Sequence, residues 1–254
     1  MIRFDIINMK KIKKLMRKFI RNIHVDDIKF LNKKIDKNIE LQQNLLSLEK
    51  IQTQLDLKAF FPSTNWSLPP RFIEHVLNEI VINNKKEIVE FGSGYSTICL
   101  AQFLKSSKAE IKFYSIESDL KWFELIKKKL IEYEIDDYVH LVYAPTKVNK
   151  GLGDNLWYDV KVLEKLLTHL TEIDLVVVDG PVGAATKNSR MPAIPYLKDR
   201  LCNSATIFLD DTNRDDEKFI IESWAQLLHV NYQAFGRYGV ISLTGNYGTA
   251  PFGS

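Results

Sequence analysis

The chain has 254 residues, of which 45% are hydrophobic and 26% charged, with a formal net charge of +3 and two cysteines. This is the composition of a soluble globular protein, and no apolar run is long enough to span a bilayer or to form a signal peptide. Residues 1–37 hold twelve Lys or Arg against four Asp or Glu, a net charge of +8 that leaves −5 on the remainder. The acidic body disfavours a nucleic-acid partner, and two cysteines form no disulfide framework, so we expect a cytoplasmic protein.

Residues 1–58 are predicted to form a helical, basic N-terminal segment. No Gly or Pro occurs in 9–58, and apolar residues recur mostly three or four positions apart, at Ile28, Leu31, Ile35, Leu41, Leu45, Leu48, Ile51 and Leu55. A helix packed on its own domain and a self-associating coiled coil explain this pattern equally well. We expect 41–55 to pack against protein and 9–37 to be more exposed. The exposed part is then free to form a homo-oligomer or to contact an anionic membrane surface.

Residues 59–254 are predicted to form one α/β domain. After the proline-rich stretch 60–70, a helix is expected over 71–82, followed by alternating strands and helices. The expected strands are 87–91, 112–117, 139–144, 173–179 and 205–210, and the expected helices are 96–105, 119–134, 160–170, 193–201 and 215–228. Such alternation indicates a mostly parallel, Rossmann-like sheet. The stretch "YQAFGRYGVISL" (232–243) reads as two strands joined by a turn near Gly236, which predicts an antiparallel C-terminal edge.

The stretch "EFGSGYST" (90–97) places two glycines between two apolar runs. A strand, a glycine turn and a helix start often hold a nucleotide-like ligand, although a tight turn that binds nothing has the same appearance. Thr97 stands where a dinucleotide fingerprint needs its third glycine, and the hydroxyls of Ser96 and Thr97 suit capping of free backbone N–H groups. Since Glu90 disfavours a phosphate beside the turn, we expect an amine or a sulfonium there.

Acidic residues follow four of the expected strands, at the edge where open α/β sheets bind their ligands. Glu117 ends the second strand, 23 residues after Gly94, a spacing that suits hydrogen bonds to ribose hydroxyls. Asp179 follows "VVVDGP", and Asp210 and Asp211 follow "FLDD". Packing alone does not explain carboxylates at the ends of buried apolar strands. Asp119 has the simpler explanation of a helix cap.

The ordered motifs "VEFGSGYST", "YSIESD", "VVVDGP" and "IFLDD" resemble those of class I S-adenosylmethionine-dependent methyltransferases over roughly residues 68–245. The resemblance implies S-adenosyl-L-methionine as cofactor, with Glu117 on the ribose and Tyr143 and Ala144 near the adenine. It places the methionine part of the cofactor at the glycine turn. The residues of that turn taken as cofactor-binding are Glu90, Gly92, Ser93, Gly94, Ser96 and Thr97.

Two further resemblances concern the acceptor. The stretches "DGPVG", "RMPAIPYL", "LDDTNR" and "WYD" resemble sugar O-methyltransferases of the glucuronoxylan 4-O-methyltransferase type and bacterial relatives associated with surface polysaccharides. A nucleotide-activated sugar is then the expected small-molecule partner. The acids also resemble those of catechol- and caffeoyl-CoA-type O-methyltransferases, which implies a divalent cation on Asp179, Asp210 and Asp211. Those enzymes carry a lysine where this chain has Val182.

The chemistry of methyl transfer to a hydroxyl needs a base or a metal, because a sugar hydroxyl is a very weak acid. The catalytic candidates are Asp179, Asp211 and Arg190, and Arg190 and Arg214 are suited to holding an anionic group of the substrate. Oxygen ligands suit Mg²⁺, Mn²⁺ or Ca²⁺. The alternatives are a metal-dependent enzyme acting on another small molecule and a Rossmann-like binding protein without catalysis.

Overall fold

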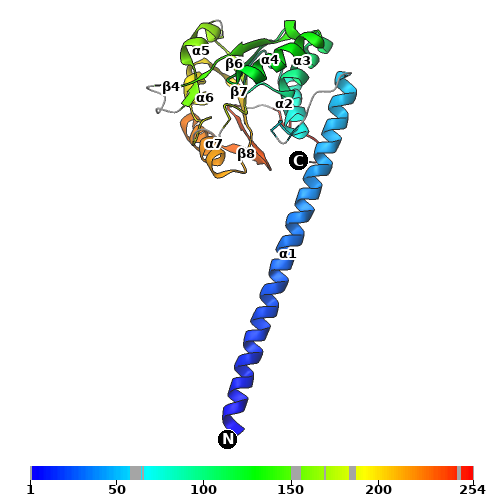
Figure 1. Ribbon diagram of the computed structural model, residues 1–254, viewed down its shortest axis with the longest axis vertical. Coiled ribbons are helices and arrows are strands. Elements are labelled where there is room, and N and C mark those ends of the chain that lie inside the picture. The colour runs from blue at the N-terminus through cyan, green and yellow to red at the C-terminus, as the bar shows by residue number, and fades with distance from the viewer. Residues whose placement is uncertain are drawn as a thin grey trace. The chain divides into compact units, whose positions relative to one another are not determined.

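The computed structural model describes residues 2–57, 64, 66–149, 156–168, 170–182, 187–244 and 247–253. Three parts of the predicted elements lie outside the described residues: residue 58 of the N-terminal helix, residues 60–63 and 65 of the proline-rich stretch, and residue 169 of the helix expected over 160–170. The chain divides into two compact units, Met1–Leu45 and Leu46–Ser254, whose helices and strands are drawn in Figure 1.

The second unit is built on a seven-stranded sheet with the order β3-β2-β1-β6-β7-β9-β8. Its strands are β1 (Glu87–Phe91), β2 (Lys112–Glu117), β3 (His140–Tyr143), β6 (Ile173–Val178), β7 (Leu201–Leu209), β8 (Tyr232–Phe235) and β9 (Tyr238–Ser242). The first five strands in the sheet pair in parallel, while β9 runs antiparallel to β7 and β8 antiparallel to β9. The predicted mostly parallel sheet with an antiparallel edge is therefore confirmed.

Helices cover both faces of this sheet because its central strands are apolar on both sides. In β1, Ile88 belongs to a core cluster shared with α2, α3 and α4, whereas Val89 and Phe91 belong to a second cluster shared with α5, α6 and α7. The bounds of these helices are α2 (Pro70–Ile82), α3 (Tyr95–Ser107), α4 (Leu120–Glu132), α5 (Val160–Leu167), α6 (Ala193–Leu197) and α7 (Asp215–Leu228). A ligand therefore has access to the sheet at the ends of its strands rather than on the faces that these helices cover.

The largest differences from the expectation are a shifted boundary between a helix and a strand and a hairpin that was not predicted. The helix predicted over 193–201 ends at Leu197, continues as a 3₁₀ turn (Lys198–Arg200) and gives way to β7 at Leu201 rather than at 205. Polar residues at the start of β7 conceal the strand pattern there. A short antiparallel hairpin of β4 (Thr146–Val148) and β5 (Leu156–Tyr158) was not predicted, because three residues are too few to show a period of two.

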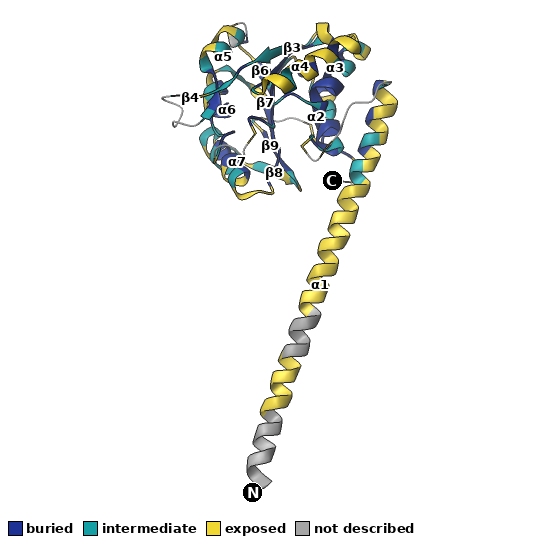
Figure 2. Ribbon diagram, in the orientation of Figure 1, coloured by how far each residue is buried: buried dark blue, intermediate teal, exposed yellow. Residues whose placement is uncertain are grey.

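Helix α1 (Ile2–Leu55) crosses the boundary between the two units. In the second unit, Ile51 and Leu55 are buried in the first core cluster, and Lys50 pairs with Glu74 on α2 at 2.6 Å. The described side chains of residues 11–18 and 25–42 are exposed (Figure 2). The expected packing of 41–55 holds from 47 onward and is wrong for the leucines before it, since Leu41, Leu45 and Leu46 are more than half exposed. No helix in the described part of the chain is both long and apolar enough to cross a membrane.

A buried polar network links α2 to the residues just before the C-terminus. Lys85 Nζ donates to the carbonyl of Ser204 at 2.7 Å and pairs with Glu79 at 3.1 Å. Thr206 and Thr249 donate their hydroxyls to the two oxygens of Glu79. We call this group the tail network; its members are His75, Glu79, Lys85, Thr206, Tyr238 and Thr249.

Candidate active site

The two glycines of the turn after β1 have different roles. Gly92 has φ +93°, and a Cβ atom there would lie 2.7 Å from the backbone nitrogen of Gly180, which follows β6. Both a side chain and an ordinary backbone conformation are thus excluded at Gly92. Gly94 has an extended backbone with φ −177°, and a Cβ there would meet open space. The turn is therefore packed closely against the end of β6 at Gly92 and open to a ligand at Gly94.

Glu90 lies beneath this turn and is fully buried. Its carboxylate accepts hydrogen bonds from Ser96 at 2.5 Å, from Thr97 at 2.6 Å and from Ser115 at 2.6 Å. Burial raises the pKa of Glu90 to about 7, although the three hydroxyls counteract this shift. Thr97 also accepts from the backbone N–H of Gly94, as predicted for a cap, whereas the bond found for Ser96 among the described residues is the one that its hydroxyl donates to Glu90. Glu90 thus orders the start of α3, and its predicted contact with the methionine part stays a prediction.

Glu117 at the end of β2 is tied to the same turn. One carboxylate oxygen accepts from the backbone N–H groups of Ser118 and Asp119, and the other accepts from the N–H and the hydroxyl of Ser93. Burial raises the pKa of Glu117, although these N–H groups favour the ionised form. Asp119 caps α4 by accepting from the backbone N–H of Trp122, as predicted. The carboxylate is thereby held rigidly at the carboxyl edge of the sheet.

The region expected to hold the adenine lies next to Glu117. Tyr143 is the register partner of Glu117 in β3, and its ring packs 5.7 Å from that of Phe123. Ala144 is fully buried and donates its backbone N–H to the carbonyl of Glu117. Of the two predicted residues, only Tyr143 presents side-chain surface for a ligand.

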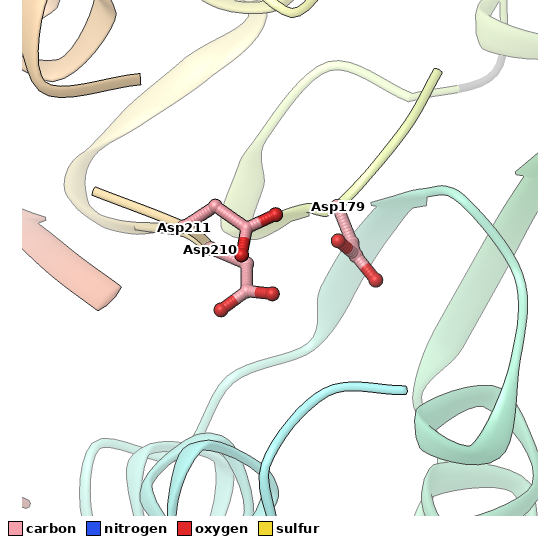
Figure 3. A group of neighbouring side chains, drawn as sticks. All are labelled: Asp179, Asp210 and Asp211. Carbon is pink, nitrogen blue, oxygen red and sulfur yellow. The ribbon is translucent and has the colours of Figure 1, made fainter. Parts of the chain in front are cut away.

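Three carboxylates meet at the neighbouring strand ends. Asp179 follows β6, Asp210 and Asp211 follow β7, and one oxygen from each lies within 4.8 Å of the others (Figure 3). Asp211 has φ +62°, a left-handed conformation that is uncommon outside glycine, asparagine and aspartate. The structure therefore brings together the three acids that the sequence predicted; we call them the acid cluster.

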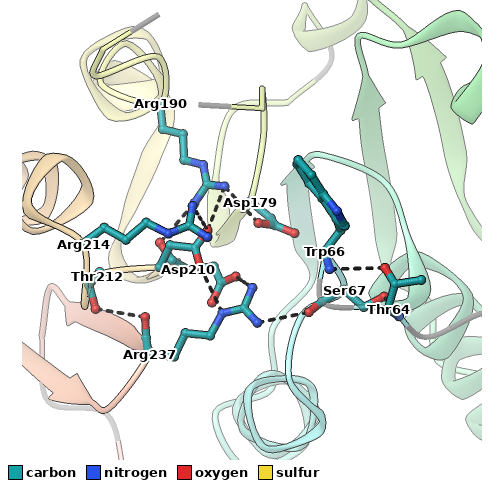
Figure 4. Close-up of polar contacts among 10 residues, drawn as sticks. Thr64, Trp66, Ser67, Asp179, Arg190, Asp210, Thr212, Arg214 and Arg237 are labelled. Carbon is teal, nitrogen blue, oxygen red and sulfur yellow. Dashed lines mark hydrogen bonds and ion pairs between the residues drawn. The ribbon is translucent and has the colours of Figure 1, made fainter. Parts of the chain in front are cut away.

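Three arginines neutralise the acid cluster (Figure 4). Arg190, which is buried, contacts Asp179 at 3.1 Å and Asp211 at 3.3 Å, and also donates to the backbone carbonyl of Asp210. Arg214 contacts Asp211 at 2.9 Å, and its side chain is 60% exposed. Both arginines thus pair with the acids, and their predicted contact with an anionic group of the substrate stays a prediction.

The third arginine, Arg237, was not predicted. Its guanidinium contacts Asp210 at 2.6 Å and Asp211 at 3.1 Å. A signal was present in the sequence, because an edge strand antiparallel to β7 must begin beside the end of β7. Gly239 of β9 is indeed the register partner of Leu209, and Arg237 lies two residues before it.

The three acids differ in exposure and protonation. Burial, with the charge of Asp179, raises the pKa of Asp210 to about 7, and one oxygen of this fully buried side chain has no partner among the described residues. Burial also raises the pKa of Asp179, with Arg190 opposing the shift. The side chain of Asp179 is 20% exposed, whereas those of Asp210 and Asp211 are 0% and 6% exposed. Asp179 is therefore the acid that a substrate can reach.

An exposed tryptophan lies beside the acid cluster. Arg237 donates to the carbonyl of Ser67 at 3.4 Å, and the preceding residue, Trp66, is 73% exposed. Thr64 accepts from the backbone N–H of Trp66 and so orders this short stretch. Figure 4 shows the Trp66 ring on the side of the cluster that faces Asp179. A large apolar ring is thereby offered next to the reachable acid.

The acid cluster has the ligand atoms of a divalent-cation site but not the charge of one. Three carboxylates within 4.8 Å have the ligand chemistry that Mg²⁺ or Mn²⁺ prefers. Their charges, however, are already balanced by Arg190, Arg214 and Arg237. As these residues stand, they do not fit a cation, and we derive no step through one.

Comparisons with known proteins agree with this architecture. Residues 89–212 match the family model of a methyltransferase domain, and no curated protein matches the chain. Similar solved structures include the SAH-bound methyltransferase PaMTH1 of Podospora anserina, with a TM-score of 0.52 and 16% identity over 78% of this chain and 88% of that one. An O-methyltransferase from Bacillus cereus in complex with SAH has a TM-score of 0.50 and 13% identity over 80% of this chain and 91% of that one. Residues 89–212 thus resemble a methyltransferase domain, and the chain shares the fold of these solved methyltransferases.

Proposed function

We propose that the protein transfers a methyl group from S-adenosylmethionine to a hydroxyl group of a sugar. The observation that carries the proposal is the position of Asp179. Its partly exposed carboxylate directly precedes Gly180, whose backbone packs against Gly92 in the predicted cofactor turn. A base is thereby held next to the place where the reactive methyl group is expected. The SAH bound in two similar solved structures supports the choice of cofactor.

In this proposal the chain's residues divide the work of an in-line displacement. S-adenosylmethionine, when bound, supplies an electrophilic methyl group. Glu117 accepts hydrogen bonds from ribose hydroxyls, and the open side of Gly94 admits the methionine part. Asp179 accepts the proton of the acceptor hydroxyl while the new O–C bond forms and the S–C bond breaks, with its electron pair remaining on sulfur. Arg190 orients Asp179 through its 3.1 Å contact.

A sugar acceptor is favoured by the residues around Asp179. The exposed Trp66 ring suits the apolar face of a pyranose, and the exposed Arg214 suits a carboxylate or phosphate on the same molecule. A nucleotide-activated sugar for a surface polysaccharide combines both features, in line with the resemblance of the motifs. The second candidate is a phenolic small molecule, because the exposed Trp66 ring beside Asp179 would also suit an aromatic acceptor.

The test is methyl transfer by the purified chain. Labelled S-adenosylmethionine is offered with nucleotide sugars in one set of reactions and with catechols in another, and products are identified by mass spectrometry. We expect methylated sugar, and a loss of about 10²–10⁴-fold in rate for Asp179→Asn. Asp199→Asn, on an exposed turn outside the cluster, is the matched control. If only catechols are methylated, the acceptor is a phenol and not a sugar. If Asp179→Asn leaves the rate unchanged, Asp179 is not the base.

A further inference from the structure

The arginines of the site occupy most of the oxygen atoms that a metal would use. Of the six carboxylate oxygens in the acid cluster, four contact a guanidinium: one oxygen of Asp179, one of Asp210 and both of Asp211. Divalent cations of the Mg²⁺ type take about six oxygen ligands. The oxygens left without a guanidinium are one on Asp179 and one on the fully buried Asp210, and a cation bound to them would be repelled by three arginines.

Arg237 has a particular place among the three arginines. It contacts the side-chain carboxylates of both acids after β7, with one nitrogen on Asp210 and another on Asp211, whereas Arg190 reaches Asp210 only at its backbone carbonyl. It also joins the cluster to the Trp66 stretch through the carbonyl of Ser67. Its side chain is 23% exposed, so a cation from solvent could enter where the guanidinium lies if the arginine were absent.

We propose that Arg237 holds the acid cluster together in place of a divalent cation, and that the cluster binds such a cation only when Arg237 is removed. Removing the guanidinium frees one oxygen of Asp210 and one of Asp211, next to the Asp210 oxygen that already lacks a partner. It also leaves three carboxylates facing two arginines. The cluster then has both the free ligands and the net negative charge that a cation needs.

The test is calorimetric titration of the full chain with Mn²⁺, without cofactor or acceptor. We expect no saturation of the wild-type protein up to about 1 mM Mn²⁺. We expect Arg237→Met to bind one equivalent of Mn²⁺ with a dissociation constant at least tenfold below this limit. Its melting temperature should be higher with Mn²⁺ than without it. The double variant Arg237→Met with Asp210→Asn should lose that binding. Arg200→Met, which removes an arginine stacked on Tyr196 outside the cluster, should behave as the wild type.

Two results would overturn the proposal. One is wild-type binding of a single Mn²⁺ that Asp210→Asn abolishes, because the arginines would then not exclude the cation. The other is a folded Arg237→Met variant that binds no Mn²⁺. Arg237→Gln, which keeps hydrogen-bond donors without the charge, serves as the second variant if circular dichroism shows that Arg237→Met does not fold.

One consequence of the proposal rests on the proposed function. If the chain is a methyltransferase, its rate should stay within about twofold after exhaustive chelation, since no step uses a cation. Loss of activity in EDTA that Mn²⁺ restores would contradict the arginine proposal while leaving methyl transfer established. Absence of methyl transfer in all conditions would instead count against the proposed function, and the titration would still decide the role of Arg237.

Discussion

The second unit contains two buried charged clusters, and they differ in how completely the protein satisfies them. In the tail network, Lys85 has three acceptors, from Ser204, Thr206 and Glu79, and no buried side-chain atom of the network lacks a partner among the described residues. In the acid cluster, by contrast, an oxygen of Asp210 and the Nε of Arg190 have no partner there. Two exposed side chains, those of Trp66 and Arg214, also border the acid cluster.

This difference separates a structural role from a functional one. A network whose donors and acceptors are all matched gains nothing from a ligand, and its main effect is to join the C-terminal residues to α2 and β7. A cluster with unmatched buried atoms beside exposed aromatic and cationic groups is prepared for a further molecule. We therefore expect substitutions in the tail network to change stability and substitutions around the acid cluster to change activity.

The largest expected effect on stability comes from Lys85→Met. The variant leaves Glu79 buried without its cation, and removing one member of a buried ion pair typically costs about 3–5 kcal/mol. Urea unfolding should report this loss in the free energy of unfolding, while Asp179→Asn should change it by less than about 1 kcal/mol. A Lys85→Met variant as stable as the wild type, or an Asp179→Asn variant as unstable as Lys85→Met, would break the distinction between the clusters.

The next effect is a pH dependence that originates in His75. Thr249 donates to Glu79, so its oxygen must accept from Nε2 of His75, and Nδ1 is left to accept from Tyr238. Burial lowers the pKa of this neutral imidazole to about 4, with Glu79 opposing and Arg71 adding to the shift.

The pKa of His75 is lower in the folded than in the unfolded protein. The contribution of neutral His75 to the free energy of unfolding is therefore present above pH 6.5 and is lost as the pH falls toward 4. Relative to His75→Gln, the wild type should lose about 2 kcal/mol of unfolding free energy between pH 7 and pH 5. Parallel unfolding curves for the two proteins over this range would contradict the assignment.

A smaller effect is expected from a substitution of Glu117, and it concerns cofactor affinity rather than stability. Glu117→Gln keeps the shape and loses the charge that favours two ribose hydroxyls, so SAH affinity should fall about tenfold, or about 1.4 kcal/mol. Calorimetry would measure this, with Glu124→Gln on the exposed face of α4 as the matched control. If the wild-type chain does not bind SAH, the proposed cofactor is wrong. If Glu117→Gln and Glu124→Gln bind SAH with equal affinity, Glu117 does not contribute to the cofactor site.

The sequence predicted the strand-end acids because hydrophobic strands and their order determine which residues reach one edge of a parallel sheet. Asp179, Asp210 and Asp211 come together for that reason. Arg237 was missed because its role depends on the antiparallel pairing of β9 with β7, a contact between segments about 30 residues apart. The tail network was missed for a similar reason: Glu79, Thr206 and Thr249 are far apart in the chain, and a lone glutamate in a helix usually faces solvent.

The N-terminal unit contrasts with both clusters, because the apolar side chains that the structure describes in residues 11–18 and 25–42 are exposed rather than buried. Ile28, Leu31 and Ile35 are more than half exposed on α1, next to a high density of Lys and Arg. Exposed apolar surface costs about 25 cal/mol per Å², so we propose that a second copy of the helix covers this stripe. Contact with an anionic membrane surface is the other outcome that an experiment has to distinguish.

The smallest expected effect on the site is that of deleting residues 1–37. Both clusters are built entirely from residues beyond 66, so SAH affinity and the methyl-transfer rate should stay within about twofold of the wild type. Light scattering should instead show a smaller particle, because the stripe that pairs two copies is gone. A full-length chain that is already monomeric at high concentration would refute the oligomer. Sedimentation with anionic vesicles would then show whether the basic helix binds a lipid surface instead.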